Sequence, residues 1–195
     1  MGNREDLLAG ARRCLEERGW GRTTVRDIAA ASGGISHAAI GYHFGSRERL
    51  LMEAFFQSME EWEREVAGAM GAADPAAPSE RRLEAMWERI IESIHRRRPL
   101  WVANLEALVE AQRSPELRRQ LAEGQAAVRH SFAAMVLGVD EELVSEQDAR
   151  RVGAVHLALL GGVVAMCLTD PDHSPSGSDI VLGLRAMGGL ATPGA

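Results

Sequence analysis

The chain has 195 residues, of which 46% are hydrophobic, and it carries a formal net charge of −6. This length fits one domain or two small ones around an ordinary packed core, and the negative charge argues against a protein coated uniformly for nucleic acid. The charge is uneven, because residues 1–50 hold eight Arg and six Asp or Glu, a net +2 that leaves −8 for the rest. A basic end on an acidic body is typical of a small DNA-reading head.

Apolar residues recur at three- and four-residue steps along almost the whole chain, which predicts an all-α protein. In the first part, helices are expected over about 4–18, from Thr24, from Ser36 to about Phe44, and over 47–70. Thr24 with Asp27 forms a capping-box pattern, and Ser36 and Ser46 are suitable N-caps. The Pro and Gly content of residues 71–79 predicts a loop. Further helices are expected over 80–97, 100–112 and 116–137. A polar connection at 140–145 then leads into an apolar helix that ends at about Thr169, and a last helix is expected over 179–190.

Cys14 and Cys167 are isolated and lie in apolar helical patterns, which predicts two reduced core thiols and a cytoplasmic location. The N-terminus is charged from Arg4 onward, so no signal peptide is expected. The most apolar run, residues 152–168, contains His156 and is interpreted as a buried helix rather than a membrane span.

Residues 24–50 carry the strongest functional signal. Two short helical patterns are separated by Gly33-Gly34, and an aromatic Tyr42-His43-Phe44 string and a Gly45-Ser46 start signal follow. This order is the sequence form of a helix-turn-helix, whose second helix can lie in the major groove of DNA. The segments TTVRDIA, GIS, IGYHF and GSRERLL resemble the N-terminal DNA-binding domain of the TetR family of bacterial transcriptional regulators, over roughly residues 4–51.

Two departures from that family's pattern fall in this region. Ser36 stands eight positions after Ile28, where the family usually has a step of seven, and Gly34 is the apparent extra residue. An added glycine is tolerated in a turn because it accepts unusual φ and ψ angles, although the second helix is then free to tilt. The family's usual Lys after the Gly-Ser turn is Arg47 here, which keeps the charge.

The resemblance implies a homodimeric regulator, most often a repressor, that binds double-stranded operator DNA. Residues 1–51 would form the three-helix DNA-binding domain, and residues 52–195 a larger helical domain for ligand binding and dimerisation. Short side chains early in the second helix allow close approach to bases, and His37 can donate a hydrogen bond to a base or phosphate. The predicted DNA contacts are Thr24, Ser36, His37, Ala38, Ala39, Tyr42, His43 and Arg47.

Aromatic and Met residues in the second part of the chain are candidates to line an effector pocket, although such residues are more often simple core. Asn104 and Glu106 are polar among apolar neighbours, and either would orient a ligand or lie on the surface. Because few cations stand among these positions, a hydrophobic, neutral or cationic effector is expected. The candidate lining is Trp62, Met86, Trp87, Trp101, Asn104, Glu106, Phe132 and Met135.

The two last helices carry more apolar surface than two flanking helices need, and by family resemblance they would pair with a second copy as a four-helix interface. The candidate interface residues are Val155, His156, Leu159, Val163, Ile180, Leu184 and Met187.

Catalysis and metal binding are not expected. His95, His130 and His156 lack acidic or thiol neighbours at metal-binding spacing, and no nucleotide-binding or hydrolase motif is found, so neither a cofactor nor an enzyme activity is predicted. The alternative is a helical ligand-binding or enzymatic dimer that has lost DNA binding, and the enlarged Gly33-Gly34 turn is its best support.

Overall fold

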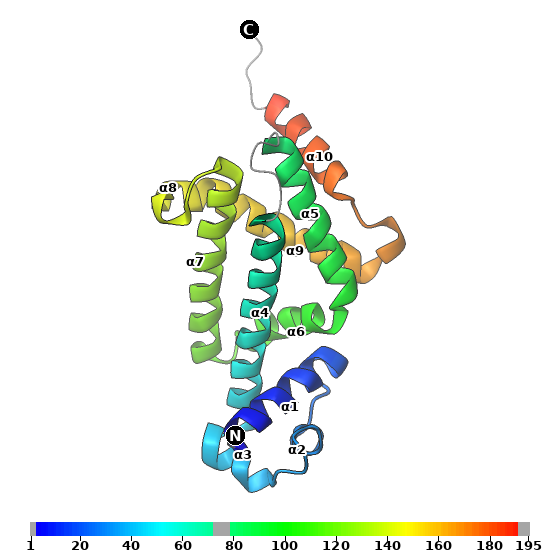
Figure 1. Cartoon of the computed structure of the whole chain (residues 1–195), viewed down its shortest axis with the longest axis vertical. Coiled ribbons are helices and arrows are strands. Elements are labelled where there is room, and N and C mark those ends of the chain that lie inside the picture. The colour runs from blue at the N-terminus through cyan, green and yellow to red at the C-terminus, as the bar shows by residue number, and fades with distance from the viewer. Residues whose placement is uncertain (1–2, 72–78, 191–195) are drawn as a thin grey trace. The chain divides into compact units, whose positions relative to one another are not determined.

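The computed structural model describes residues 3–71 and 79–190, and every regular element in these ranges is helical (Figure 1). The α-helices are α1 (Asn3–Arg18), α2 (Val25–Ala31), α3 (His37–Phe44), α4 (Arg47–Gly71), α5 (Ser79–Arg96), α6 (Arg98–Glu110), α7 (Pro115–Leu137), α8 (Glu146–Asp148), α9 (Ala154–Thr169) and α10 (Gly177–Leu190). The all-α prediction is confirmed.

The helix boundaries follow the sequence signals closely. α5 ends at Arg96 and α6 begins at Arg98, so the break expected between residues 97 and 100 is confirmed, and Pro99 lies in the first turn of α6, where its missing N–H costs nothing. Pro115 is the first residue of α7. Most of the loop predicted over 71–79 lies outside the described residues. The long apolar helix expected up to Thr169 is continuous from Glu146, but residues Ala149–Gly153 form a π-helical turn that joins α8 to α9.

The chain divides into two compact units. The first contains residues 1–64 and 97–121, and the second contains residues 65–96 and 122–195. The first unit therefore holds the helix-turn-helix together with α6, and α4 and α7 each contribute residues to both units. The sequence predicted a boundary between residues 51 and 52 that separates a DNA-binding domain from a ligand-binding domain. That boundary stays a prediction, because the two compact units divide the chain by packing and not by function.

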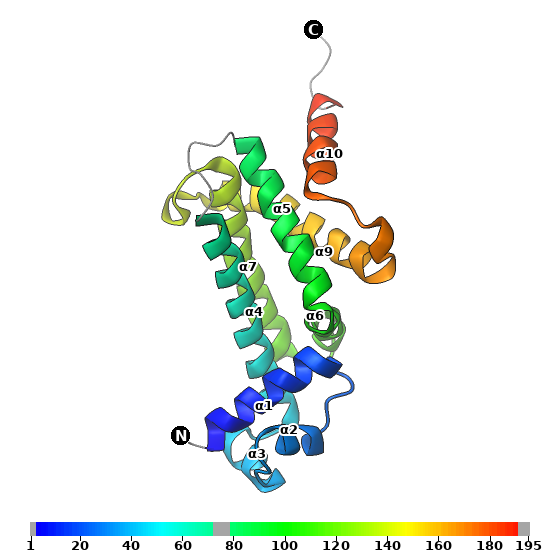
Figure 2. The ribbon, with the colours of Figure 1, turned by 45° about the vertical axis from the view of Figure 1, so that its right-hand side comes forward.

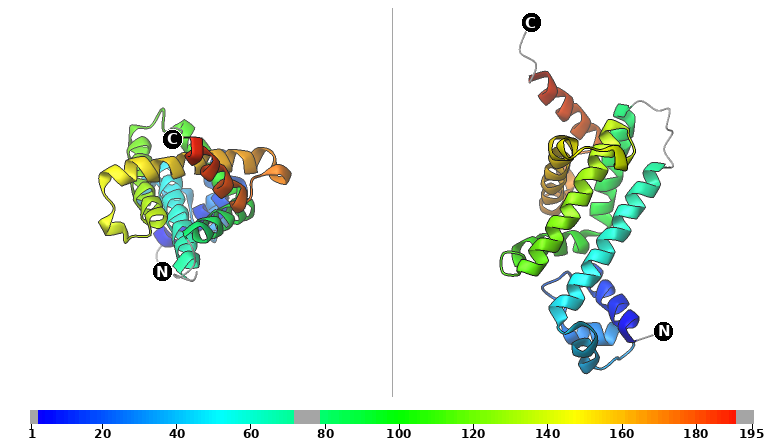
Figure 3. Two further views of the ribbon diagram at one scale, coloured as in Figure 1. Left: turned by 90° about the horizontal axis from the view of Figure 1, so that it is seen from above. Right: turned by 90° about the vertical axis from the view of Figure 1, so that its left-hand side faces the viewer.

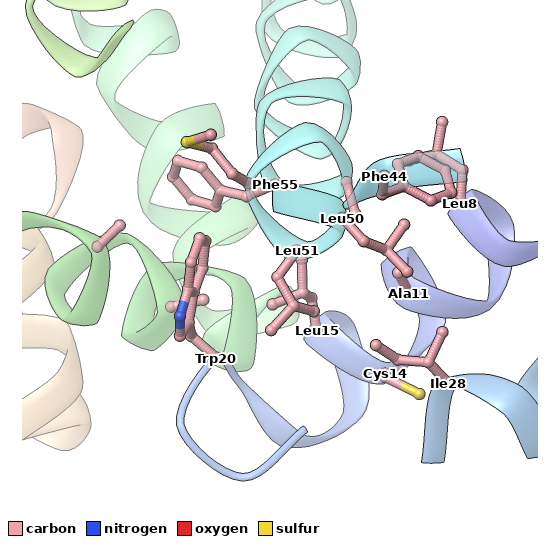
Figure 4. Close-up of a cluster of buried hydrophobic side chains, with 14 of the residues drawn as sticks. Leu8, Ala11, Cys14, Leu15, Trp20, Ile28, Phe44, Leu50, Leu51 and Phe55 are labelled. Atoms are coloured by element: carbon pink, nitrogen blue, oxygen red, sulfur yellow. The ribbon is translucent and has the colours of Figure 1, made fainter. Parts of the chain in front are cut away.

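The core of the first unit forms where α1, α2, α3 and the start of α4 meet (Figure 4). Leu7, Ala11 and Leu15 lie on one face of α1 at four-residue spacing, and all three are fully buried. Trp20 follows α1 and packs edge-on against Phe55 of α4, with 6.1 Å between the ring centroids. Burial of large apolar side chains is the main stabilising term of a small domain, at about 1.5–3 kcal/mol for each one.

The second unit is built around α5, which packs against both α9 and α10 (Figure 2). Gly177, the first residue of α10, donates its N–H to a carboxylate oxygen of Glu88 on α5 at 2.8 Å. A short connection with one 3₁₀ turn, Pro171–His173, links α9 to α10 (Figure 3). This unit buries Met86, Trp87 and the aromatic side chains that face them.

The approach of the π-turn to α7 depends on a glycine. A Cβ atom added to Gly153 would lie 1.9 Å from the carbonyl oxygen of Arg129 and 2.7 Å from its carbonyl carbon. Both neighbours are backbone atoms, so no side-chain rotation relieves the overlap. The start of α9 can therefore lie this close to α7 only with glycine at this position.

We expect Gly153→Ala to lower the free energy of unfolding by at least about 2 kcal/mol, because the helices must separate to accept the methyl group. Gly68→Ala is the matched control, since Gly68 has open space around an added Cβ as far as the described residues reach: none of their atoms outside its own helix backbone lies within 4 Å. That change should raise the stability by about 0.5–1 kcal/mol, because alanine is the better helix former. Urea unfolding of both variants measures the difference, and equal stabilities would contradict the close backbone contact.

Candidate functional site

The turn between α2 and α3 is ordered by its two glycines. The N–H of Gly34 donates to the carbonyl of Ala29 and that of Gly33 to the carbonyl of Ala30, the hydrogen-bond pattern of a Schellman motif. Gly33 and Gly34 have φ angles of +78° and +83°, in the left-handed region that favours glycine. The additional glycine thus forms part of a defined helix end, and α3 starts three residues later.

One side of α3 is buried and the other is exposed. Ile40 and Phe44, one helical turn apart, enter the core of the first unit. Their burial turns His37, Ala38, Gly41 and Tyr42 toward solvent. Tyr42 is 86% exposed, although tyrosine usually packs part of its ring against the protein. We call these four residues the α3 outer face.

The other predicted DNA contacts at or near α3 are Ser36, Ala39 and His43. Ser36 is the N-cap residue, as predicted, but its side chain makes no capping hydrogen bond and is exposed. Ala39 is half-buried against the core. His43 is also half-buried, and its ring lies edge-on to Tyr42 with 4.9 Å between the ring centroids. His43 therefore supports the position of Tyr42.

The side chain of Thr24 caps the N-terminus of α2. Its hydroxyl donates to a carboxylate oxygen of Asp27 at 2.6 Å and accepts from the N–H of Asp27 at 3.2 Å, which confirms the capping box. The hydrogen bonds from the Thr24 hydroxyl and N–H, with a smaller contribution from Arg18, lower the pKa of Asp27. Because the hydroxyl hydrogen is directed at Asp27, Thr24 is chiefly a structural residue.

Arg47 is held by the protein itself. Its Nε donates to the carbonyl of Thr23 at 2.6 Å, and one Nη donates to the carbonyl of Trp20 at 2.9 Å. The other Nη lies 3.2 Å from Glu48. These contacts tie the first turn of α4 to the segment between α1 and α2. Three of its five guanidinium N–H groups are thus engaged within the protein, which the sequence pattern alone does not reveal, and a phosphate contact by Arg47 stays a prediction.

Arg26 is a better-placed cation that the sequence interpretation passed over. It lies in the first turn of α2, is exposed, and makes no hydrogen bond or ion pair with any described residue. Its exposure could have been anticipated, because Val25, Ile28 and Ala29 already define the inward side of this helix. A long arginine with no intramolecular partner can reach a phosphate without breaking an existing contact.

The aromatic candidates for an effector site fall into two groups, one in each unit. In the first unit, Trp62 of α4 and Trp101 of α6 are buried and meet edge-on at a centroid distance of 4.9 Å. Asn104 is half-buried in α6. A carboxylate oxygen of Glu106 accepts from the N–H of Gly21 at 2.9 Å, so Glu106 has a structural role instead of a position free for ligand.

In the second unit, Trp87 and Phe132 stack at a centroid distance of 6.2 Å, and both are buried. Met86 is fully buried beside Trp87 in sequence, whereas Met135 is half-buried. The ring of His156, on α9, completes the cluster at 6.4 Å from Trp87 and 6.1 Å from Phe132. We call Trp87, Phe132 and His156 the aromatic triad.

The candidate dimer residues do not all face the same way. His156 and Val163 are buried within the second unit, so they cannot contact a partner directly. Val155 and Met187 are about half exposed, and Leu159, Ile180 and Leu184 are half-buried. From the sequence, Gly161 and Gly162 are also expected to allow close helix approach at the interface, and Gly162 is exposed. The described exposed surface adds four apolar residues that the sequence interpretation omitted, namely Ala158 and Met166 of α9 and Leu182 and Ala186 of α10.

These exposed residues recur on α9 at steps of three and four, which forms one apolar stripe of small and medium side chains. The helix from Glu146 to Thr169 is long and apolar enough, by length and composition alone, to cross a membrane, a test that core helices also pass. Among the described residues, no group of three or more His, Cys, Asp or Glu is placed to hold a metal ion. Both cysteines are free and buried, and burial raises the pKa of each thiol.

Comparison with known proteins separates the chain into two matched regions. Residues 7–54 match the model for bacterial regulatory proteins of the tetR family. Residues 78–179, just over half of the chain, match the model for the C-terminal region of BetI-type transcriptional repressors. The chain belongs to the TetR family.

Individual TetR-family relatives agree with this assignment. The chain is 42% identical over 52 residues to the transcriptional repressor AcnR of Corynebacterium efficiens, a match that covers 27% of each protein. It is 29% identical over 160 residues to the transcriptional regulator BetI of Agrobacterium fabrum, covering 82% of this chain and 74% of BetI. The match to AcnR thus spans about a quarter of that relative's length.

A solved structure shares the fold. A transcriptional regulator from Saccharomonospora viridis in complex with choline superimposes with a TM-score of 0.70 at 23% identity, covering 94% of both chains. These relatives are regulators, which supports the prediction that this TetR-family chain is not an enzyme. The family resemblance predicted from residues 4–51 is confirmed.

If Arg47 is a structural residue, Arg47→Ala should lower the free energy of unfolding by about 2 kcal/mol, because hydrogen bonds from a charged donor to two backbone carbonyls are lost. Arg26→Ala, the matched control, should change it by less than about 0.5 kcal/mol, since Arg26 is exposed and contacts none of the described residues through a hydrogen bond or an ion pair. Thermal and urea unfolding of the two variants measure this contrast, and indistinguishable stabilities would return Arg47 to the set of phosphate contacts.

Proposed function

We propose that this protein is a DNA-binding transcriptional repressor that acts in the cytoplasm. The α3 outer face carries the proposal, because a short helix with one buried side presents small residues, a histidine and an almost fully exposed tyrosine on the other. The names of the relatives AcnR and BetI support regulation of transcription. The ordered Gly33-Gly34 turn removes the main argument for the alternative, a dimer that has lost DNA binding.

The α3 outer face suits the major groove of DNA. Ala38 and Gly41 allow close approach of the helix, and Ala38 offers a methyl group to a thymine methyl. His37 can donate to a base acceptor from the first turn. Tyr42 reaches a phosphate with its hydroxyl, and Arg26 supplies a charged phosphate contact. Phosphate contacts set the position on the duplex, while the α3 contacts select the sequence.

Two substitutions distinguish these roles. Arg26→Ala should weaken binding to operator and random DNA similarly and lower the salt dependence of binding by about one unit of slope, because one phosphate contact is lost. His37→Ala should reduce the ratio of operator to random binding, by roughly 1–3 kcal/mol, because a base contact is lost. Fluorescence anisotropy at several salt concentrations, with DNA from upstream of the protein's own gene, measures both effects.

Arg89→Ala serves as the control, since Arg89 is an exposed arginine in the second unit whose one ion pair with a described residue is a 4.0 Å pair with Glu92. It should leave both affinities and the salt dependence almost unchanged. If His37→Ala lowers both affinities equally, His37 does not read a base. A loss from Arg89→Ala equal to that from Arg26→Ala would mean that only the total charge matters.

We further propose a homodimer formed through the apolar stripe of α9 and the exposed side of α10. Val155, Ala158, Gly162 and Met166 follow one side of α9, and glycine at a helix crossing permits close backbone approach. Outside its own helix backbone, no atom of the described residues lies within 4 Å of a Cβ added at Gly162, so this position is open to a partner helix. A symmetric dimer would present two α3 helices to a near-palindromic operator.

Val155→Glu should dissociate the dimer and reduce operator binding together, because the carboxylate would be buried at the interface. It should leave the folded monomer intact, since Val155 is half exposed. Leu143→Glu is the control, because Leu143 is 72% exposed and lies outside the stripe. Sedimentation at micromolar concentration reports the assembly state, and a monomeric wild type would contradict the proposal.

The effector is proposed to be a small hydrophobic molecule, neutral or cationic, that binds in the helical region and shifts the population toward a state that cannot bind operator. The buried aromatic side chains support this choice, because their faces bind apolar groups and attract cations. The S. viridis protein was solved in complex with choline, a small cation, which supports the cationic option and not the hydrophobic one. The response is tested by adding candidate effectors to the protein–operator complex and following release.

A further inference from the structure

Most glycines of the first unit are explained by the fold itself. A positive φ angle, which favours glycine over other residues, is found at Gly19, Gly33, Gly34 and Gly45. Gly10 and Gly21 instead lie against close neighbours. A Cβ atom added to Gly10 would overlap the hydroxyl oxygen of Ser32, and one added to Gly21 would lie 3.1 Å from a carboxylate oxygen of Glu106. Each of these glycines therefore has a reason within the chain.

Gly41, on the α3 outer face, has neither reason. Its φ angle is not positive, and outside its own helix backbone and its two chain neighbours no described atom lies within 4 Å of an added Cβ. Inside a helix, glycine is less favourable than alanine because it loses more backbone freedom on folding. The fold alone would therefore favour alanine at this position, which indicates that glycine serves a contact made from outside the chain.

The missing side chain of Gly41 leaves an open place on the surface of α3. Residues three and four positions apart are neighbours on a helix, so Ala38 and His37 flank this place on its N-terminal side. Both are exposed, and Tyr42, the next residue, is 86% exposed. We call the open place at Gly41, with the methyl group of Ala38 beside it, the Gly41 notch. A partner can approach the helix backbone there without displacing a side chain.

The Gly41 notch is apolar. The carbonyl oxygen of Gly41 accepts from the N–H of Gly45 at 3.0 Å. The N–H of Gly41 lies inside the helix, where such groups donate to the carbonyl four residues earlier. The notch therefore offers a partner only the C–H groups of Gly41 and Ala38. A donor or acceptor on a base would lose its water there and gain no hydrogen bond. On the base edges of the major groove, the apolar group is the 5-methyl of thymine.

We propose that the Gly41 notch receives the 5-methyl group of one thymine in each half of the operator, so that Gly41 is a specificity-determining residue. The bare Cα of Gly41 lets α3 approach the base, and the methyl group of Ala38 packs beside the thymine methyl. Any side chain at position 41 would hold α3 away from this base. The inference rests on the proposed function, because it names a base that the repressor selects.

Uracil differs from thymine only in the missing 5-methyl group, so deoxyuridine in place of single thymines removes this group alone. The probe is the duplex that the protein protects upstream of its own gene, and fluorescence anisotropy with the full-length protein measures affinity. We expect one thymine in each half-site at which the replacement weakens binding about fourfold, the effect of one methyl group removed from a contact. Replacement in both half-sites should weaken binding about fifteenfold, because distant changes add in free energy.

Gly41→Ala should fill the notch with a methyl group of the protein. It should weaken binding to the thymine operator about tenfold and abolish the preference for thymine over uracil, because α3 can no longer approach the base. The variant should melt about 1–4 °C higher than wild type, since alanine is the better helix former. A gain in stability with a loss of operator binding distinguishes a role in recognition from a role in folding.

Two variants serve as controls. Gly68→Ala changes a glycine of α4 that is equally open among the described residues and lies in the second unit. It should bring a similar gain in melting temperature and leave operator binding unchanged. His37→Ala alters the α3 outer face without filling the notch. It should weaken operator binding, yet keep the fourfold preference for thymine over uracil.

The inference is overturned if no thymine of either half-site responds to the loss of its methyl group. It is also overturned if Gly41→Ala binds the operator as tightly as wild type does, or if that variant still prefers thymine to uracil. Selection of the operator over a shuffled duplex by wild type separates the two levels. If wild type selects the operator but does not distinguish thymine from uracil, the notch assignment fails alone. If it selects no duplex, the proposed repressor function fails together with the notch.

Discussion

The burial of Ile40 and Phe44 is the constraint on which the rest of the first unit depends. These two side chains stand one helical turn apart, and their insertion between α1 and the start of α4 fixes the rotation of α3 about its axis. Once that rotation is fixed, the opposite side of α3 must face solvent, and this side carries His37, Ala38, Gly41 and Tyr42. A recognition surface on a helix of eight residues thus exists because the opposite surface is packed.

Several supports keep this arrangement rigid, and most of them are backbone hydrogen bonds. The Schellman end of α2 sets the direction of the turn, and the capping box of Thr24 and Asp27 sets the start of α2. Arg47 joins α4 to the segment before α2 through two carbonyl oxygens. These contacts explain why polar residues close to the outer face differ in role: Thr24 and Arg47 hold the framework, whereas His37 and Arg26 remain available to a ligand.

The sequence predicted the helices well because their signals are local. Capping residues, prolines and apolar spacing act within a few positions, and α1, α2, α3 and α4 begin and end close to where those signals place them. Arg47 was assigned differently because its partners, Thr23 and Trp20, lie 24 and 27 residues away in the chain. No local pattern reveals such a contact.

The orientation of α9 could not be predicted for another reason. This helix is apolar on all sides, so its sequence does not indicate which side is buried in the chain and which is open to a partner. The π-turn before it also adds a residue to one turn and changes the register of everything that follows. His156 and Val163 were therefore assigned to an outer surface, while the structure places them inside.

The α3 outer face is proposed to recognise a defined DNA sequence. Footprinting of wild-type protein on the DNA upstream of its own gene tests this most directly, with a shuffled duplex of the same composition as competitor. The account predicts a discrete protected site composed of two related half-sites about one helical turn or more apart. Protection spread evenly over the duplex, or removed equally well by the shuffled competitor, would contradict it.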